Sequence, residues 1–233
     1  MRIAKSDFLV LISAGAEWRE ILPLFPGVHP DQSPYGEYFV SDVFKYPVIF
    51  FHGGWGKVAS AGATQYAIDR WDPDLLINLG TCGGVEGLID HNTLILAEET
   101  VIYDIIEGMS SYQKAIDHYT TRADLDWLGD ELPFPVKRTK LYSADRDLRP
   151  EDVSGVLSRF GAVAVDWESG AFAWVCARNR KSWLELRGVT DLVSSTSGEA
   201  LGNVAIWHQR IAATMQAMLS HLPWLLERYK STH

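Results

Sequence analysis

The chain has 233 residues, 47% of them hydrophobic and 22% charged, which is enough for one large α/β unit with a sizeable core. Its net charge of −9 argues against a broad contact with the phosphates of nucleic acid, since such contacts need Lys and Arg. Its apolar runs are short of the roughly 20 residues that span a bilayer, and its two cysteines are too few for a disulfide scaffold, so we expect a cytoplasmic protein that binds small molecules rather than nucleic acid or membrane.

The first half of the chain predicts strands and helices in alternation. Residues 8–12 form a continuous apolar run, as expected of a central strand that is covered on both faces. Helical spacing follows over 17–25, and small residues predict a closely packed helix over 57–71. The other strands expected here are an antiparallel pair over 38–40 and 47–51, and a buried strand over 74–78 that runs into a glycine-rich segment.

The second half continues the alternation after one irregular segment. Residues 103–122 are polar, aromatic and weakly periodic, which predicts a long loop of the kind that often carries function. The strands expected are 93–97, 140–143, 162–165 and 183–187, and the helices are 150–160, 168–178 and 203–229. The whole pattern predicts a single domain over residues 1–233, built on a twisted, mixed but mostly parallel sheet flanked by helices.

Motifs for phosphate and metal binding are incomplete. Lys57 is followed by Val58 rather than Ser or Thr, so a Walker loop would lack its magnesium-binding hydroxyl. Residues 54–59 match a relaxed dinucleotide fingerprint, which stays an alternative although no acid ends the next strand. The seven histidines are scattered singly, which does not support a metal site. We therefore expect chemistry without a metal or an organic cofactor.

Polar residues and glycines follow the expected ends of four apolar strands, where open α/β sheets bind ligands. Three of these segments are INLGTCGG at 77–84, AVDWESGAF at 164–172 and LRGVTDLV at 186–193. Two weaker motifs are EWREI at 17–21 and GWGKV at 54–58. The three segments resemble core motifs of the methylthioadenosine/S-adenosylhomocysteine nucleosidases, which belong to the nucleoside phosphorylase superfamily, and the two weaker motifs are similar to others of that family. The resemblance implies a nucleoside phosphorylase-like fold, a homodimer whose long middle loop completes the neighbour's site, and hydrolysis of a purine nucleoside that releases adenine.

The resemblance also implies roles for individual residues, and these suit the reaction. Cleavage of a ribosyl C–N bond builds positive charge on the sugar and negative charge on the base, so it needs an acid, carboxylates by the sugar and a placed water. The acid would be Asp191, with Thr190 beside it at N7 of the purine. Glu168 would bind the ribose hydroxyls, while Glu20 and Thr81 would position the water.

Each role has an ordinary structural alternative. Asp191 could cap the segment that follows it, and Glu168 could be a first-turn carboxylate favoured by the helix dipole. Glu20 could face solvent, with Glu17 close enough to be confused with it. Arg187, expected to orient the substrate, could equally be a buried ion-pair partner.

The substrate-binding residues depart from the family pattern in places. Gly83 keeps the glycine that lets the backbone approach a ligand. Trp167, however, stands where Met is usual under the ribose, and Asp147, followed by Leu148, stands where Phe or Leu usually stacks on the purine. Glu17 stands near a usual thioether-contacting Met. The preferred nucleoside and its 5′ substituent therefore stay open.

Two other functions compete with hydrolysis. Phosphorolysis on the same fold needs cationic groups for phosphate; related phosphorylases have an Arg at the position of Asn78, although Arg19 matches the spacing of a second phosphate arginine. A non-catalytic nucleoside-binding protein of this fold is disfavoured because all three carboxylates are present.

Overall fold

The structure of the protein is a computed structural model, which describes residues 6–42, 45–157 and 160–233. Its sheet has ten strands, nine of them in the order β10-β6-β8-β9-β5-β1-β4-β3-β2, with β7 paired to β6. The strands are β1 (Phe8–Ile12), β2 (Asp31–Gln32), β3 (Glu37–Ser41), β4 (Val48–His52), β5 (Leu75–Val85), β6 (Leu94–Ile102), β7 (Thr120–Arg122), β8 (Lys137–Ser143), β9 (Ala164–Asp166) and β10 (Ser182–Val193).

The sheet curls upon itself at one side. Because β10 pairs with β5 as well as with β6, the strands β10, β6, β8, β9 and β5 close into a five-stranded barrel, from which β1 to β4 extend as an open sheet. Parallel pairs include β1–β5, β5–β10 and β6–β8, whereas β6–β10 and β5–β9 are antiparallel. The expected mixed α/β sheet is therefore confirmed, and its closure into a barrel is a feature that the sequence pattern did not predict.

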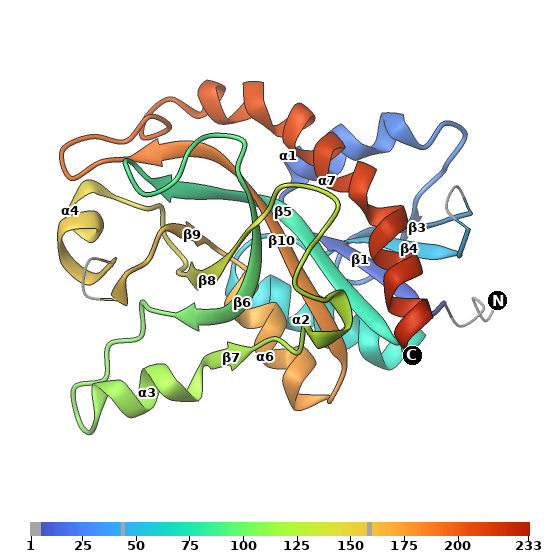
Figure 1. The fold of residues 1–233 in the computed structure, drawn as a ribbon, viewed down its shortest axis with the longest axis horizontal. Coiled ribbons are helices and arrows are strands. Elements are labelled where there is room, and N and C mark those ends of the chain that lie inside the picture. The colour runs from blue at the N-terminus through green and yellow to red at the C-terminus, as the bar shows by residue number, and fades with distance from the viewer. Residues whose placement is uncertain (1–5, 43–44, 158–159) are drawn as a thin grey trace.

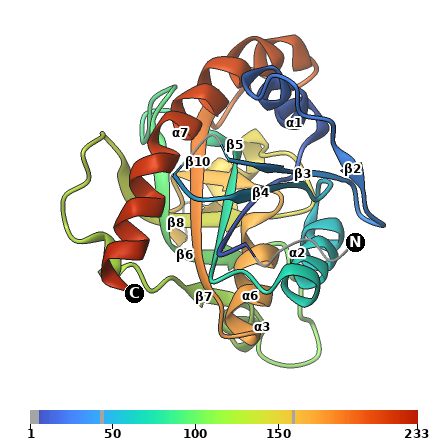
Figure 2. The same cartoon turned by 90° about the vertical axis from the view of Figure 1, so that its right-hand side faces the viewer.

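Helices cover both faces of the sheet (Figure 1). They are α1 (Gly15–Ile21), α2 (Lys57–Trp71), α3 (Tyr112–His118), α4 (Pro150–Asp152), α6 (Ser169–Arg178) and α7 (Val204–Thr232). Figure 2 shows α1 and α7 on one face and α2 and α6 on the other. Side chains of β1 alternate between these layers, as a strand requires: Phe8, Val10 and Ile12 pack in the core under α7, while Leu9 and Leu11 pack in the core with α2 and α6.

Several element boundaries differ from those expected. The predicted strand over 74–78 continues to Val85, and the one over 183–187 continues to Val193, because both become walls of the barrel. The prediction of a loop over 103–122 is wrong at its end, where α3 and β7 form. The helix expected over 150–160 is a short turn, α4, followed by a π-helical turn over Val153–Leu157; residues 158–159 lie outside the described part. In the described part, no helix is long and apolar enough to cross a membrane.

Candidate active site

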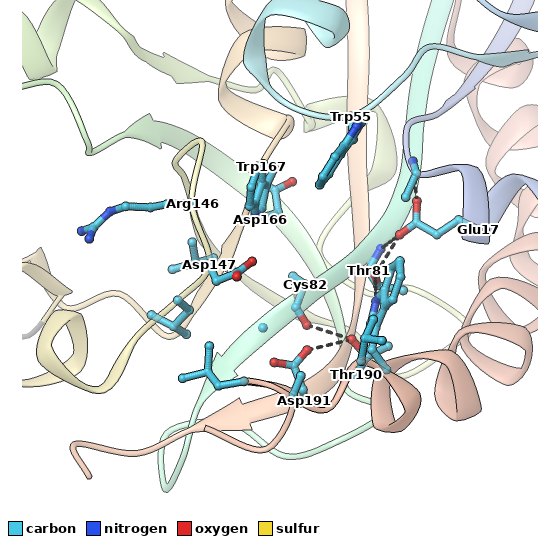
Figure 3. Close-up of a pocket in the computed structure, with 18 of the residues that line it drawn as sticks. Glu17, Trp55, Thr81, Cys82, Arg146, Asp147, Asp166, Trp167, Thr190 and Asp191 are labelled. Carbon is cyan, nitrogen blue, oxygen red and sulfur yellow. Dashed lines mark hydrogen bonds between the residues drawn. The ribbon is translucent and has the colours of Figure 1, made fainter. Parts of the chain in front are cut away.

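A cavity of about 520 Å³ lies at the end of the barrel where β5 and β10 approach their C-termini. Its size is typical of a pocket for a small molecule. The predicted site residues that line it are Thr81, Gly83, Asp147, Leu148, Trp167, Glu168, Thr190 and Asp191. Figure 3 shows side chains from separate elements converging on this space. Two predicted residues, Glu20 and Arg187, do not line it.

A buried carboxylate, Glu17, faces the cavity from the first helix. Its Oε1 accepts hydrogen bonds from the backbone N of Thr81 at 2.6 Å and from the Thr81 hydroxyl at 2.8 Å. Its Oε2 accepts one from the N of Ala14 at 3.2 Å. Burial raises the pKa of Glu17, although Arg187 and the bonds from Thr81 lower it in part. This carboxylate is fixed in place and is suited to accept a proton.

The expectation for Glu20 does not fit its position. Glu20 is exposed on α1, one turn beyond Glu17, and does not reach the cavity. The helix begins at Gly15, earlier than predicted, so that Glu17 occupies its third position and faces the sheet. Of the two carboxylates of α1, Glu17 and not Glu20 therefore lines the cavity, and it stands there bonded to Thr81.

Glu168 precedes the first turn of α6, as predicted, and its side chain is turned into the cavity. Its Oε1 accepts a hydrogen bond from the backbone N of Gly56 at 2.9 Å. Gly56 has a φ of 83°, a conformation that side chains disfavour, and a Cβ there would lie 3.1 Å from Asp145 Oδ1. Burial, together with the neighbouring Asp166, raises the pKa of Glu168. The loop of the GWGKV motif thus serves to hold this carboxylate.

Behind the cavity wall lies a cluster of buried charges centred on Arg187. The guanidinium donates to Asp166 Oδ2 at 2.8 Å and to Asn78 Oδ1 at 3.2 Å, and its Nη2 lies 3.3 Å from Glu185 Oε2. Arg187 is 1% exposed. It is therefore a buried ion-pair partner and not the direct substrate contact that we expected. Asp166, two residues before Glu168, also accepts from the hydroxyl of Ser143 at 2.7 Å.

Asp191 projects into the cavity from β10. The pairing of β10 with β5 slips between Val189 and Asp191, and this bulge turns the Asp191 side chain inward. The Thr190 hydroxyl lies 3.1 Å from Asp191 Oδ1. Burial raises the pKa of Asp191, while the Thr190 bond lowers it in part. A Cβ on Gly83 would lie 3.4 Å from Asp191 Oδ2 and 3.7 Å from Leu148, so the glycine keeps the space between them open for a flat ligand.

The loop after β8 supplies one polar and one apolar side chain to the cavity. Figure 3 shows the carboxylate of Asp147 pointing toward Cys82 and Asp191, whereas Arg146 extends away. Arg146 forms an ion pair with Asp152. Leu148, 6% exposed, provides an apolar surface next to Gly83. The polar residue predicted at the stacking position is therefore present at the cavity.

Sequence reasoning missed two aromatic residues of the site. Trp55 is 68% exposed and stacks on Trp167 at a centroid distance of 5.2 Å and an angle of 19°. The Trp207 indole, from α7, donates to the Thr81 hydroxyl at 2.9 Å. Trp55 belongs to the GWGKV motif and could have been noticed there, but no sequence signal joined Trp207 to Thr81. Among the described residues, no group of three or more His, Cys, Asp or Glu is arranged to hold a metal ion.

Comparisons with known proteins agree on one family. The model of the Phosphorylase superfamily matches residues 16–222. The 5′-methylthioadenosine/S-adenosylhomocysteine nucleosidase of Thermotoga maritima is 26% identical over 163 residues, which cover 65% of this chain and 69% of that protein. The nucleosidase of Tolumonas auensis is 22% identical over 202 residues, covering 80% and 86%. The solved nucleosidase from S. pneumoniae with a transition-state inhibitor superposes with a TM-score of 0.76 at 17% identity, covering 94% of this chain and 99% of that one.

Proposed function

Because the chain belongs to the Phosphorylase superfamily, we propose that it is an N-ribosyl hydrolase that cleaves a purine nucleoside, with 5′-methylthioadenosine and S-adenosylhomocysteine as the first substrates to test. The names of its relatives supply this substrate class. The observation that carries the proposal is that Asp191, Glu168 and Glu17 line one cavity, each with a pKa that burial raises.

The proposed mechanism assigns one task to each carboxyl group. Asp191, protonated, donates to the base as the C–N bond breaks, which neutralises the charge on the leaving group. Glu168 binds the ribose hydroxyls, and positive charge on the sugar favours its ionised form, so this interaction strengthens as the reaction proceeds. Glu17 accepts a proton from the attacking water, which the Thr81 hydroxyl helps to orient. The products are the free base and the free sugar.

Phosphorolysis has less support at this cavity. Asn78 is fully buried and bonded to Arg187, and Arg19 is exposed on α1 outside the cavity. Among the described residues that line the cavity, the cationic side chain is Arg146, which is paired with Asp152. A dianion would thus meet carboxylates rather than the cations that phosphate needs.

We expect base release at the same rate in phosphate-free buffer and in buffer containing phosphate, with free sugar as the product. The test is a panel of 5′-methylthioadenosine, S-adenosylhomocysteine, adenosine and inosine, with products separated by chromatography. Ribose 1-phosphate, formed only when phosphate is present, would assign the chain to the phosphorylases instead. Binding without turnover of any nucleoside would favour the non-catalytic alternative.

The position of Asp147 leads to a prediction about the base. Its carboxylate can accept a hydrogen bond from the amino group of adenine and repels the carbonyl oxygen of hypoxanthine. A hydrogen bond to a charged group is worth about 1.5–3 kcal/mol, so Asp147→Phe should reduce the preference for adenosine over inosine roughly 10- to 100-fold in kcat/KM. The preference of Asp147→Asn, whose side chain has the same size as Asp, should lie between those of the wild type and Asp147→Phe. An unchanged preference in both variants would mean that Asp147 faces solvent when substrate is bound.

We also propose that the protein is a cytoplasmic homodimer, as the family resemblance and the low cysteine count suggest. The segment before α3 supports an interface because Ile106 and Met109 are 92% and 98% exposed there. Light scattering on the purified protein would measure the mass of the assembly.

A further inference from the structure

A cluster of charged side chains lies outside the cavity, next to the backbone of Asp191. One oxygen, Glu199 Oε2, accepts hydrogen bonds from the N of Leu192 at 3.1 Å and from Arg210 Nη1 at 2.8 Å. His91 Nε2 lies 2.7 Å from the same oxygen. These residues come from the segment after β10, from α7 and from the turn before β6, so the cluster joins three parts of the fold.

The cluster holds the backbone on both sides of Asp191. Arg210 Nη1 donates to the carbonyl of Thr190 at 2.5 Å, and the Glu199 carboxylate accepts from the amide of Leu192. The backbone N of Glu199 also donates to the carbonyl of Leu192 at 3.0 Å. The residues before and after Asp191 are therefore both fixed by side chains that do not touch the cavity.

The cluster lies beside an irregularity in the pairing of β10. The slip in pairing between β10 and β5 occurs between Val189 and Asp191. A bulge interrupts the ladder of backbone hydrogen bonds and re-aims a side chain. Glu199 and Arg210 supply bonds to this interrupted backbone, and the direction of the Asp191 side chain depends on its geometry.

Glu199 and Arg210 act on the charge of Asp191 in opposite directions. After burial and the Thr190 bond, the negative charge of Glu199 raises the pKa of Asp191, and the positive charge of Arg210 lowers it; Asp147 raises it from the opposite wall. Glu199 itself stays ionised, because bonds from Arg210, His91 and Leu192 outweigh partial burial and lower its pKa to about 2.

We propose that Glu199 and Arg210 are positioning residues for the acid: by holding the backbone of Thr190 and Leu192, they fix the bulge that aims Asp191 at the base. The inference rests on the proposed function, because it assigns Asp191 as the acid. Neither side chain touches the substrate in this arrangement; each acts through Asp191.

The test compares Glu199→Gln, Arg210→Met and Arg210→Lys with a control on α7, the helix that carries Arg210. Glu227→Gln removes an exposed carboxylate of α7 that does not line the cavity and whose partners are Lys45, at 2.7 Å, and the Tyr46 hydroxyl. The side chains of Glu199 and Arg210 are 36% and 31% exposed, so their replacement leaves no fully buried charge unpaired. Melting curves establish that each variant is folded.

We expect Glu199→Gln and Arg210→Met to lower kcat roughly 10- to 100-fold, the scale of a misplacement near 1 Å, with KM changed less than about 3-fold. Arg210→Lys should recover part of kcat, and Glu227→Gln should match the wild type. The pH above which activity falls should move down in Glu199→Gln and up in Arg210→Met, since the two charges act oppositely on Asp191. If the two residues served only the stability of the fold, the pH limits of the two variants would move in the same direction or stay unchanged.

Wild-type kcat in Glu199→Gln and Arg210→Met would overturn the positioning role and leave the proposed function standing. Inactivity of the wild type on every nucleoside would instead remove the proposed function. Titration of the Asp191 carboxyl by NMR then tests, without turnover, whether Glu199 and Arg210 act on Asp191. Identical titration of Asp191 in the wild type and in both variants would overturn that action.

Discussion

Replacement of Asp191 by Asn is expected to leave the fold intact and to lower kcat by roughly 10²- to 10⁴-fold, the usual worth of a general acid. The amide has the shape of the carboxyl group and can keep the contact with the Thr190 hydroxyl, found at 3.1 Å. It cannot deliver a proton to the base. Stopped-time assays of base release, with the KM measured in parallel, test this expectation, and near-normal kcat would assign the acid role elsewhere.

The pH dependence gives an independent check on the same residue. Burial raises the pKa of Asp191, so the protonated acid persists to higher pH than in a free Asp, and activity should fall as pH rises through that pKa. The free energy of unfolding should fall with rising pH as well, because a pKa that is raised in the folded state stabilises the fold at low pH, and this stabilisation is lost as the group ionises. Since Asn does not ionise, the Tm of Asp191→Asn relative to the wild type should rise with pH. A Tm difference that falls with pH would contradict the buried position.

Glu17→Gln is expected to reduce kcat by a similar factor, roughly 10²- to 10⁴-fold, because the amide cannot accept the proton of the attacking water. The side chain is held by Thr81 and Ala14, so the variant keeps at least one acceptor for those bonds and should fold. Glu20→Gln is the matched control: the same change, one turn further along α1, at an exposed position. It should stay within about 2-fold of the wild type.

The opposite ranking of these two variants would restore Glu20 to the site and would mean that α1 turns or shifts when substrate binds. Equal, small effects of both would show that neither carboxylate activates the water. In that case Glu168, which faces the same cavity, would be the next residue to test.

The sequence predicted the fold where periodicity was strong. The buried strand over 8–12 and the helix over 57–71 form with the expected bounds. A continuous apolar run suits a strand that is covered on both faces, and small side chains let a helix pack closely on the sheet. The predicted end of the next strand was wrong, because the glycines of 80–84 were expected to terminate it. They continue β5 instead, since β10 on one side and β9 on the other supply its pairing partners.

The differences between the expected and the observed positions of the site residues have similar physical causes. Glu17 and Glu20 lie three residues apart on one helix, so a motif could not decide between them; the position at which the helix begins does. Arg187 belongs to a family motif, but whether it faces a ligand depends on Asp166 and Glu185, which surround it in three dimensions. The contact of Trp207 with Thr81 joins positions 126 residues apart and has no local signature.

The closure of the barrel between β5 and β10 has a consequence for how the protein folds. The contact between Asn78 and Glu185 joins residues 107 positions apart, and the cavity is bounded by the same two strands. Contacts between distant parts of a chain carry a large entropic cost and form late when topology limits the folding rate. A chain that has formed only the open half of its sheet would hold Glu17 without Asp191. Enzymatic activity during refolding therefore reports the pairing of β5 with β10, which brings Asp191 to Glu17, rather than the first appearance of secondary structure.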